Sequence, residues 1–304
     1  MRQIQQLGQG TVRARIAVVG CGGAGCNTVH HLPPAPDLEL IGLNDVPHQS
    51  LLGIKHKVLI SEQELNTIAT LDDSLVKSME TDAERLIARE LIGYDFVVAV
   101  AGLGGNTGGD GANAVIRVAK LHNIPAWAIT TMPFKAEGFH RKEAARESLE
   151  RLKKRCPSVL TFANDQLLEV APDIPIRRAF SVMGQIMVKP IEVLSRIMTK
   201  EDVRTLKEFL GRSKELRLGI GEASGEHRTF AAVQEALSSP WMKFDVESAR
   251  NIVVFFSAAE VNEKLTKDVL HDISLRAPIA DLLWGVYAEG QGEKVRVSVL
   301  VPLP

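Results

Sequence analysis

The stretch FVVAVAGLGGNTGGDG, residues 96–111, decides the fold of this chain. Residues 96–101 are apolar without alternation, which predicts a strand buried on both faces of a sheet. The glycines that follow allow a ligand to approach the main chain closely, because glycine has no Cβ atom. Residues 112–122 are expected to form a helix. The segment therefore predicts a strand, a glycine-rich loop and a helix in succession, with the loop as a candidate phosphate cradle.

The N-terminal part of the chain contains a second unit of this kind. Residues 16–20 (IAVVG) predict a buried strand, and a helix is expected to begin near Asn27. Gly20, Gly22 and Gly25 satisfy the pattern G-x-G-x-x-G, whose backbone N–H groups and following helix N-terminus can hold phosphate. The pattern alone is weak, because a tight turn packed against a sheet uses the same glycines. Two such loops together favour a polyphosphate held from both sides.

A dinucleotide-binding Rossmann domain is the main alternative that the first loop leaves open. Asp45 follows a predicted strand at residues 38–43 and could accept hydrogen bonds from ribose hydroxyls. Such a domain has no need of the second glycine run at residues 102–111. A nicotinamide-dependent oxidoreductase also needs a catalytic His or Lys, and none stands in a recognisable context. We therefore favour a nucleotide-binding protein of another kind.

The composition is that of an ordinary globular protein and excludes several classes. The 304 residues contain 36 Lys and Arg against 37 Asp and Glu, so no excess charge is available to hold nucleic acid or an anionic membrane. No run approaches the roughly 20 apolar residues of a membrane span. We therefore expect no nucleic-acid partner and no membrane insertion. Cys21, Cys26 and Cys156 suggest no disulfide framework, so we expect a cytoplasmic protein. These cysteines, His30 and His31 show no metal-ligand spacing, so we expect no bound metal.

Strands and helices alternate up to about residue 165. This order predicts a mostly parallel sheet covered on both faces, with ligands at the carboxyl ends of the strands. A long apolar helix is expected over residues 177–198, followed by a smaller set of helices and strands. Short motifs occur along the chain in the order AGLGGNTGGDGA (101–112), PFKAEGFHR (133–141), NDQLL (164–168), AF (179–180) and GIGEASGEHR (219–228).

These motifs resemble those of the tubulin/FtsZ family, with the closer likeness to FtsZ, and the resemblance covers nearly the whole chain. It implies an α/β fold in which a Rossmann-like nucleotide-binding domain with a mostly parallel sheet precedes a long central helix and a smaller α+β domain. The expected divisions are a flexible N-terminal arm at residues 1–14, a GTP-binding domain at 15–175, the central helix at 176–199 and the C-terminal α+β domain at 200–304.

The resemblance implies GTP or GDP as the ligand, and Mg²⁺ is compatible with it. The first loop would hold the α- and β-phosphates and the second loop the phosphate tail, while Glu137 and Arg141 approach the ribose and Asn164 meets the guanine edge. The family also reads guanine with a carboxylate or amide on the central helix, and Gln185 is the candidate at the matching positions. The implied ligand-binding residues are Gly22, Gly23, Ala24, Gly25, Cys26, Asn27, Gly104, Gly105, Asn106, Thr107, Gly108, Glu137, Arg141, Asn164 and Gln185.

The catalytic loop departs from the family pattern. Family members complete hydrolysis in trans, through an Asn-x-Asp-x-x-Asp loop after the central helix that enters the next subunit's pocket. Here residues 197–200 (IMTK) run directly into residues 201–204 (EDVR), and only Asp202 matches the last carboxylate. A shortened loop positions water poorly, and the loss of one such contact commonly costs about 100-fold in rate. We expect slow or absent hydrolysis, with Asp202 as the only catalytic candidate.

The second glycine loop also departs from the family. Asn106 and Asp110 both stand where the family has glycine. A carboxylate at position 110 would repel phosphate unless it points away or reaches a Mg²⁺, and of the two we favour a side chain that points away. The glycine-rich turn that senses the terminal phosphate has no counterpart in residues 59–75. The preference between diphosphate and triphosphate therefore stays open.

The leading expectation is a divergent FtsZ-like cytoskeletal or scaffold protein, related to cell division or cell shape, that binds a guanine nucleotide. The resemblance implies self-association as a head-to-tail filament or a dimer, with other FtsZ-family proteins or a membrane adaptor as further partners. One alternative is an active, assembly-coupled GTPase that forms dynamic filaments with Asp202 as its acid. The other is a regulatory binding module that no longer polymerises.

Overall fold

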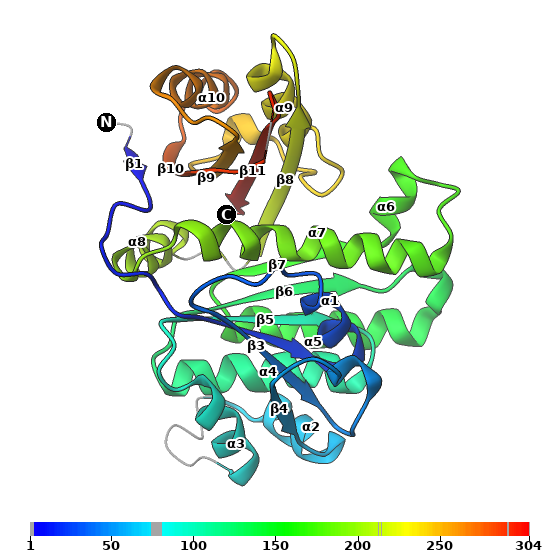
Figure 1. Ribbon diagram of the computed structural model, residues 1–304. Helices are drawn as coiled ribbons and strands as arrows, with labels where there is room; N and C mark the ends of the chain where they lie inside the picture. Colours follow the sequence, from blue (N-terminus) through cyan, green and yellow to red (C-terminus); the bar gives the residue numbers. More distant parts are fainter. Residues whose placement is uncertain (1–2, 74–80, 212, 214, 291, 304) are drawn as a thin grey trace. The chain divides into compact units, whose positions relative to one another are not determined.

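The computed structural model describes residues 3–73, 81–211, 213, 215–290 and 292–303 (Figure 1). They fall into two compact units: a large unit, Ala14–Ser195, and a C-terminal unit, in which Met1–Arg13 joins Arg196–Pro304. Most of the predicted central helix thus belongs to the large unit. Its residues 176–195 lie within that unit, so the helix does not stand apart from both domains as the predicted division has it.

The large unit is built on a parallel sheet with the strand order β7-β6-β5-β2-β3-β4. The two strands predicted before the glycine loops, β2 and β5, are adjacent, and every residue of β2 is buried. Because parallel strands place their carboxyl ends at one edge, the loops after β2 and β5 meet there. The predicted mostly parallel α/β fold is confirmed. The strands are β2 (Ile16–Cys21), β3 (Leu38–Asn44), β4 (His56–Leu59), β5 (Phe96–Gly102), β6 (Ala126–Met132) and β7 (Val159–Ala163).

Helices cover both faces of this sheet (Figure 1). One core cluster joins Ala17, Val19 and Cys21 of β2 to α2, α3, α4 and α5, while α1 packs against β2, β3 and β5. Within the described residues, no helix is long and apolar enough to cross a membrane. The helices of the large unit are α1 (Gly22–Val29), η1 (Gln49–Leu51), α2 (Glu62–Thr70), α3 (Asp82–Leu91), α4 (Asn106–Leu121), η2 (Lys135–Glu137), α5 (Phe139–Arg155), α6 (Asp165–Val170) and α7 (Ile176–Ile197).

Helix α4 begins earlier than the sequence predicts, because part of the second glycine run is helical. Its first residue is Asn106, whereas the helix is expected from residue 112. A Cβ atom on Gly109 would lie 2.4 Å from the Ser148 Oγ, and one on Gly111 would lie 2.9 Å from the Leu43 Cδ2. These glycines therefore allow α4 to pack closely on its neighbours, a tertiary requirement that outweighs the poor helix propensity of glycine.

The C-terminal unit contains a mixed sheet with the strand order β1-β10-β9-β11-β8. The predicted flexible arm instead contains β1, which pairs in parallel with β10, and Leu7 after it is 2% exposed. An open sheet edge can pair with any extended backbone, and side-chain composition does not reveal this. The elements are β1 (Ile4–Gln6), α8 (Lys200–Leu210), β8 (Glu215–Ala223), α9 (Arg228–Leu237), η3 (Val246–Ser248), β9 (Asn251–Ala258), α10 (Glu263–Arg276), β10 (Asp281–Ala288) and β11 (Val295–Pro302).

Candidate functional site

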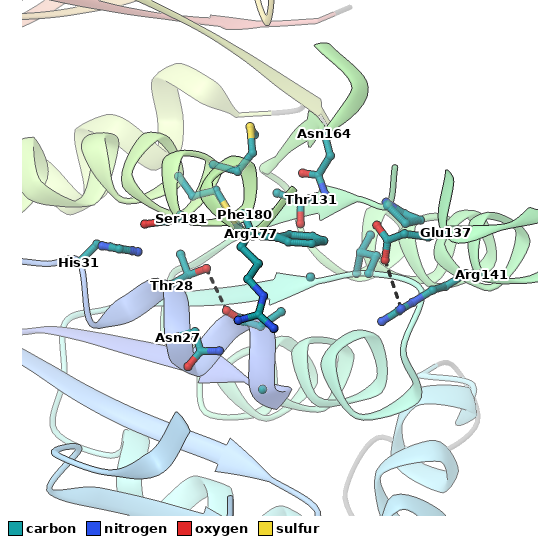
Figure 2. A pocket seen from close by; sticks show the side chains of 18 of the residues that line it. Asn27, Thr28, His31, Thr131, Glu137, Arg141, Asn164, Arg177, Phe180 and Ser181 are labelled. Atoms are coloured by element: carbon teal, nitrogen blue, oxygen red, sulfur yellow. Dashed lines mark hydrogen bonds and ion pairs between the residues drawn. The ribbon is translucent and has the colours of Figure 1, made fainter. Parts of the chain in front are cut away.

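A cavity of about 550 Å³ lies at the carboxyl ends of the strands of the large unit (Figure 2). This volume is in the range of sites for small molecules and cofactors. One face of α1, one face of α7 and segments at or after the ends of β3, β5, β6 and β7 form its walls. The lining residues are Gly23, Ala24, Asn27, Thr28, His31, His48, Gly102, Leu103, Thr131, Pro133, Glu137, Arg141, Asn164, Arg177, Phe180, Ser181, Met183, Gly184 and Met187.

The N-terminus of α1 forms one end of the cavity. This helix starts at Gly22, directly after β2, and its first turn contains no acidic side chain. The first N–H groups of a helix have no partner within it, and the helix dipole places positive partial charge there. Gly23, Ala24 and Asn27 of the predicted first loop line the cavity. This end is therefore suited to an anion such as phosphate.

The other residues predicted in the first loop lie beneath the cavity lining. Gly22 has a φ of 67°, and a Cβ atom on it would lie 2.9 Å from the Gly108 backbone N, so the two glycine loops touch here. A Cβ atom on Gly25 would lie 2.2 Å from the Val100 carbonyl oxygen. Burial raises the pKa of the Cys26 thiol to about 11. These buried residues maintain the shape of the loop, and none of them belongs to the cavity lining.

The second loop borders the cavity with fewer residues than predicted. Only Gly102 and Leu103, at and directly after the end of β5, belong to the lining. The N-terminus of α4 carries no acidic residue in its first turn and no side-chain cap, so its N–H groups are available to an anion. The predicted residues at this helix N-terminus, none of them in the cavity lining, are Gly104, Gly105, Asn106, Thr107 and Gly108.

Asp110 points away from the cavity, as predicted. Its carboxylate accepts a hydrogen bond from the Asn66 Nδ2 at 3.0 Å and pairs with the Arg151 guanidinium at 3.2 Å. The side chain is buried between α2, α4 and α5, where Asn66 and Arg151 engage its carboxylate. Of the segment without a phosphate-sensing turn, residues 74 and 75 lie outside the described residues.

Glu137 and Arg141 meet on another wall of the cavity. The Arg141 guanidinium lies 3.2 Å from the Glu137 carboxylate, whose Oε1 also accepts the Phe134 backbone N–H at 2.7 Å. Both side chains line the cavity, and Figure 2 shows the ion pair. The carboxylate is thus held in place with lone pairs left to accept from hydroxyl groups.

Asn164 lines the cavity with a carboxamide whose oxygen is unpaired. Its side chain is 3% exposed, and the Oδ1 has no hydrogen-bond partner among the described residues. Although Asn164 stands at the N-cap of α6, its side chain makes no capping bond. A buried acceptor left without a donor costs about 1–3 kcal/mol. Phe180, 47% exposed and edge-to-face with Phe134 at 5.3 Å, adds an aromatic face to the same cavity.

Gln185 does not join the other predicted residues. It is exposed on α7 and absent from the cavity lining, whereas its neighbour Gly184 is buried and lines the cavity. Gln185 points about 100° away from Gly184 around the helix, and this direction is toward solvent. The residues of α7 that line the cavity share one face of the helix instead: Arg177, Phe180, Ser181, Met183, Gly184 and Met187.

Several lining residues were missed by the sequence analysis. Helical spacing along α7 could have found Arg177, which is exposed and directed into the cavity (Figure 2). The same spacing along α1 and the turn after it could have found His31. Burial, followed by the charge of His30, lowers the pKa of His31. No sequence signal marks Thr131 or His48, because the fold brings them to the cavity from segments without a motif.

Asp202, the predicted catalytic acid, belongs to the C-terminal unit and is engaged in hydrogen bonds there. Its Oδ2 accepts from the Gly8 N at 2.9 Å, the Thr199 N at 2.8 Å and the Thr199 Oγ1 at 2.7 Å. With Thr199 it completes a capping box at the start of α8, and it is 6% exposed. The carboxylate therefore has a structural role that the sequence analysis did not expect.

Residues 15–172 match the Tubulin/FtsZ family, GTPase domain. The chain is 33% identical to Cell division protein FtsZ 1 of Pyrococcus abyssi over 95% of this chain and 81% of the relative. It is 30% identical to Cell division protein FtsZ of Methanothermobacter thermautotrophicus over 95% of this chain and 79% of the relative. The empty FtsZ dimer of M. jannaschii superposes with a TM-score of 0.81 at 27% identity, covering 96% of this chain and 89% of that one. The GDP-bound CetZ1 monomer from Haloferax volcanii, at 18% identity, shares the fold with a TM-score of 0.75 over 94% and 93% of the two chains.

Proposed function

The chain belongs to the tubulin/FtsZ family, and we propose that it binds a guanine nucleotide, GTP or GDP, in the cavity between α1 and α7. The observation that carries the proposal is the buried, unpaired Oδ1 of Asn164 in a cavity that also contains the free N-terminus of α1. The helix N-terminus suits a diphosphate or triphosphate, and an amino group of a purine would supply the donor that Asn164 lacks. Glu137 would accept from the ribose hydroxyls.

Mg²⁺ fits this proposal as an ion held mainly by phosphate oxygens and water. Among the described lining residues the one carboxylate is Glu137, and Arg141 and the Phe134 N–H already engage it. Outside the lining, Glu62 accepts a hydrogen bond from Asn106 at the N-terminus of α4. Its exposed carboxylate could contact a metal-bound water at the phosphate tail.

Identification of the bound molecule tests the proposal. The purified protein is denatured, the released ligand is separated by chromatography, and ligand-free protein is titrated with GDP by calorimetry. We expect guanine nucleotide in the preparation, or GDP binding by empty protein. Asn164→Leu should weaken binding, while Gln185→Leu, outside the cavity lining, is the matched control and should not. Empty protein that ignores both GDP and GTP would refute the proposal.

We propose that GTP hydrolysis is slow or absent, because the Asp202 carboxylate is engaged in hydrogen bonds at the start of α8. Three hydrogen bonds converge on one of its oxygens, and only 6% of the residue is exposed. A carboxylate that polarises water must be within hydrogen-bond reach of that water. We expect phosphate release from GTP at the buffer rate at every protein concentration. A rate that rises with concentration and falls in Asp202→Ala would support the alternative of an assembly-coupled GTPase.

Self-association is the third part of the proposal. Similar proteins include an FtsZ dimer from M. jannaschii and a CetZ2 protofilament from Haloferax volcanii. We expect a head-to-tail filament or a dimer with a cytoskeletal or scaffold role in cell division or cell shape, in the cytoplasm. Other FtsZ-family proteins or a membrane adaptor are further partners. Sedimentation with GTP, with GDP and without nucleotide tests this, and a monomer under all conditions would favour the regulatory module.

A further inference from the structure

Helix α1 and the turn after it line the cavity over their whole length. Ala24, Asn27, Thr28 and His31 follow the helical repeat and all belong to the lining. At 1.5 Å per residue, His31 lies roughly 10 Å along the helix from Ala24 at the phosphate end. An extended nucleotide covers a comparable span from its phosphates to its base. His31 is therefore placed at the base end of the cavity.

Gly184 of α7 makes room for the His31 ring. A Cβ atom on Gly184 would lie 2.8 Å from the His31 Cδ2 and 3.1 Å from its Nε2, so a side chain there would have to displace the ring. The imidazole thus occupies the space into which α7 would otherwise project a side chain. Figure 2 shows the ring at the wall of the cavity, and its nitrogens make no hydrogen bond within the described residues. Burial also favours the neutral ring, which keeps one donor and one acceptor.

We infer that His31 contacts the base as a specificity-determining residue, and that the pocket accepts guanine and adenine nucleotides with less than about tenfold preference. This inference rests on the proposed nucleotide binding. Guanine presents an N1–H donor where adenine presents an N1 acceptor. A neutral imidazole meets either one, because its donor and acceptor nitrogens exchange between tautomers. The Asn164 carboxamide offers a donor and an acceptor in the same way.

The charges around the cavity support this inference. A free carboxylate only accepts hydrogen bonds, so it would select guanine through the N1–H and N2–H₂ donors with charge-assisted bonds. The one carboxylate among the described lining residues, Glu137, is held by Arg141 at 3.2 Å and by the Phe134 N–H at 2.7 Å. In the proposed binding mode this carboxylate accepts from the ribose hydroxyls, so it does not select the base. The two groups assigned to the base, the His31 imidazole and the Asn164 carboxamide, each offer a donor and an acceptor, which is the condition for tolerance of both purines.

The test measures the affinities of nucleotide-free protein for GDP, ADP, CDP and inorganic pyrophosphate by calorimetry. We expect GDP and ADP to bind within about tenfold of each other. His31→Ala should weaken both purine nucleotides about tenfold and leave pyrophosphate unchanged, while His31→Asn, which keeps a donor and an acceptor, retains most of the affinity. His30→Ala is the matched control, because the His30 ring bonds the Ser50 carbonyl oxygen and is absent from the cavity lining.

A double replacement tests whether a carboxylate on α7 makes the cavity selective for guanine. In His31→Ser/Gly184→Asp the smaller serine vacates the space for a carboxylate on α7, and the GDP preference should rise more than about tenfold. Wild-type protein that prefers GDP over ADP by more than about tenfold, or purine affinities unchanged in His31→Ala, would overturn the inference and leave nucleotide binding intact. Failure of every nucleotide to bind would refute the proposed function itself and this inference with it.

Discussion

Replacing Asn164 by Leu separates a ligand-binding role of this residue from a structural one. The two side chains have similar shapes, the site is 3% exposed, and the Oδ1 has no partner among the described residues. Removal of a buried, unsatisfied acceptor relieves a cost of about 1–3 kcal/mol. The ligand-free protein should therefore become more stable by about that amount. For a unit of this size each kcal/mol raises Tm by roughly 2–4 °C.

The same replacement should weaken nucleotide binding, because the base loses its partner. One neutral hydrogen bond contributes about 0.5–1.5 kcal/mol, which corresponds to a loss of roughly 2- to 13-fold in GDP affinity. Thermal and urea unfolding of the free protein measure the first effect, and calorimetric titration measures the second. Gln185→Leu should change neither. A lower Tm together with an unchanged GDP affinity would show that the carboxamide is structural and would contradict our reasoning.

Other replacements test the remaining parts of the site. Arg177→Gln should lower the affinity for GDP about tenfold or more and leave the affinity for guanosine unchanged, since a charge-assisted bond to phosphate contributes about 1.5–3 kcal/mol. Arg178→Gln, outside the lining, is the control and should bind GDP normally. Equal losses of affinity for GDP and guanosine in Arg177→Gln would argue against a phosphate contact. Asp202→Ala should destabilise the protein by about 1–3 kcal/mol in urea unfolding through loss of the capping box, without changing GTP turnover. Gly25→Ala should cost about 3 kcal/mol or more, because its Cβ atom would lie 2.2 Å from the Val100 carbonyl oxygen. Gly23→Ala, whose nearest contact would be 3.6 Å, is its control in the same assay, and equal stabilities would contradict the packing argument. Burial lowers the pKa of His31 below its usual 6.5, so the unfolded chain binds the proton more readily than the folded chain. The contribution of His31 to the free energy of unfolding should therefore be fully present above pH 6.5 and should decrease as the pH falls below 6.5. His31→Asn should reduce this fall in urea unfolding, and an identical pH dependence would exclude a contribution from His31.

Local pattern was sufficient to predict the elements around the first glycine loop. The strand at residues 16–21 and the strand at residues 96–102 are apolar throughout because helices cover both faces of the sheet. Strand, loop and helix are neighbours in the chain, so their order predicts where an anion can bind. The positions of Glu137, Arg141 and Asn164 at the same cavity agree with the order of the motifs. Their roles toward a nucleotide remain predictions.

The predictions that differ from the structure all depend on contacts between distant segments. The helical face of α7 turns Gly184 toward the cavity and Gln185 toward solvent, a difference that a match of neighbouring positions does not resolve. Asp202 is held by the backbone of Gly8, which is remote in the chain. The N-terminal strand pairs with β10 through its backbone, so its polar side chains do not predict the contact. Helix α4 starts early because Gly109 and Gly111 pack against Ser148 and Leu43.

The sequence by itself determined the parallel sheet and the two glycine loops, because periodicity and strand–loop–helix order are properties of neighbouring residues. The family followed from the resemblance of short motifs that can be recognised in the sequence alone. Only the tertiary structure decided which side chains face the ligand cavity. Burial without a partner, as at Asn164, and the fit of the His31 ring against Gly184 arise from the packing of helices and strands that are separated in the chain. The same packing holds Asp202 in the capping box at the start of α8.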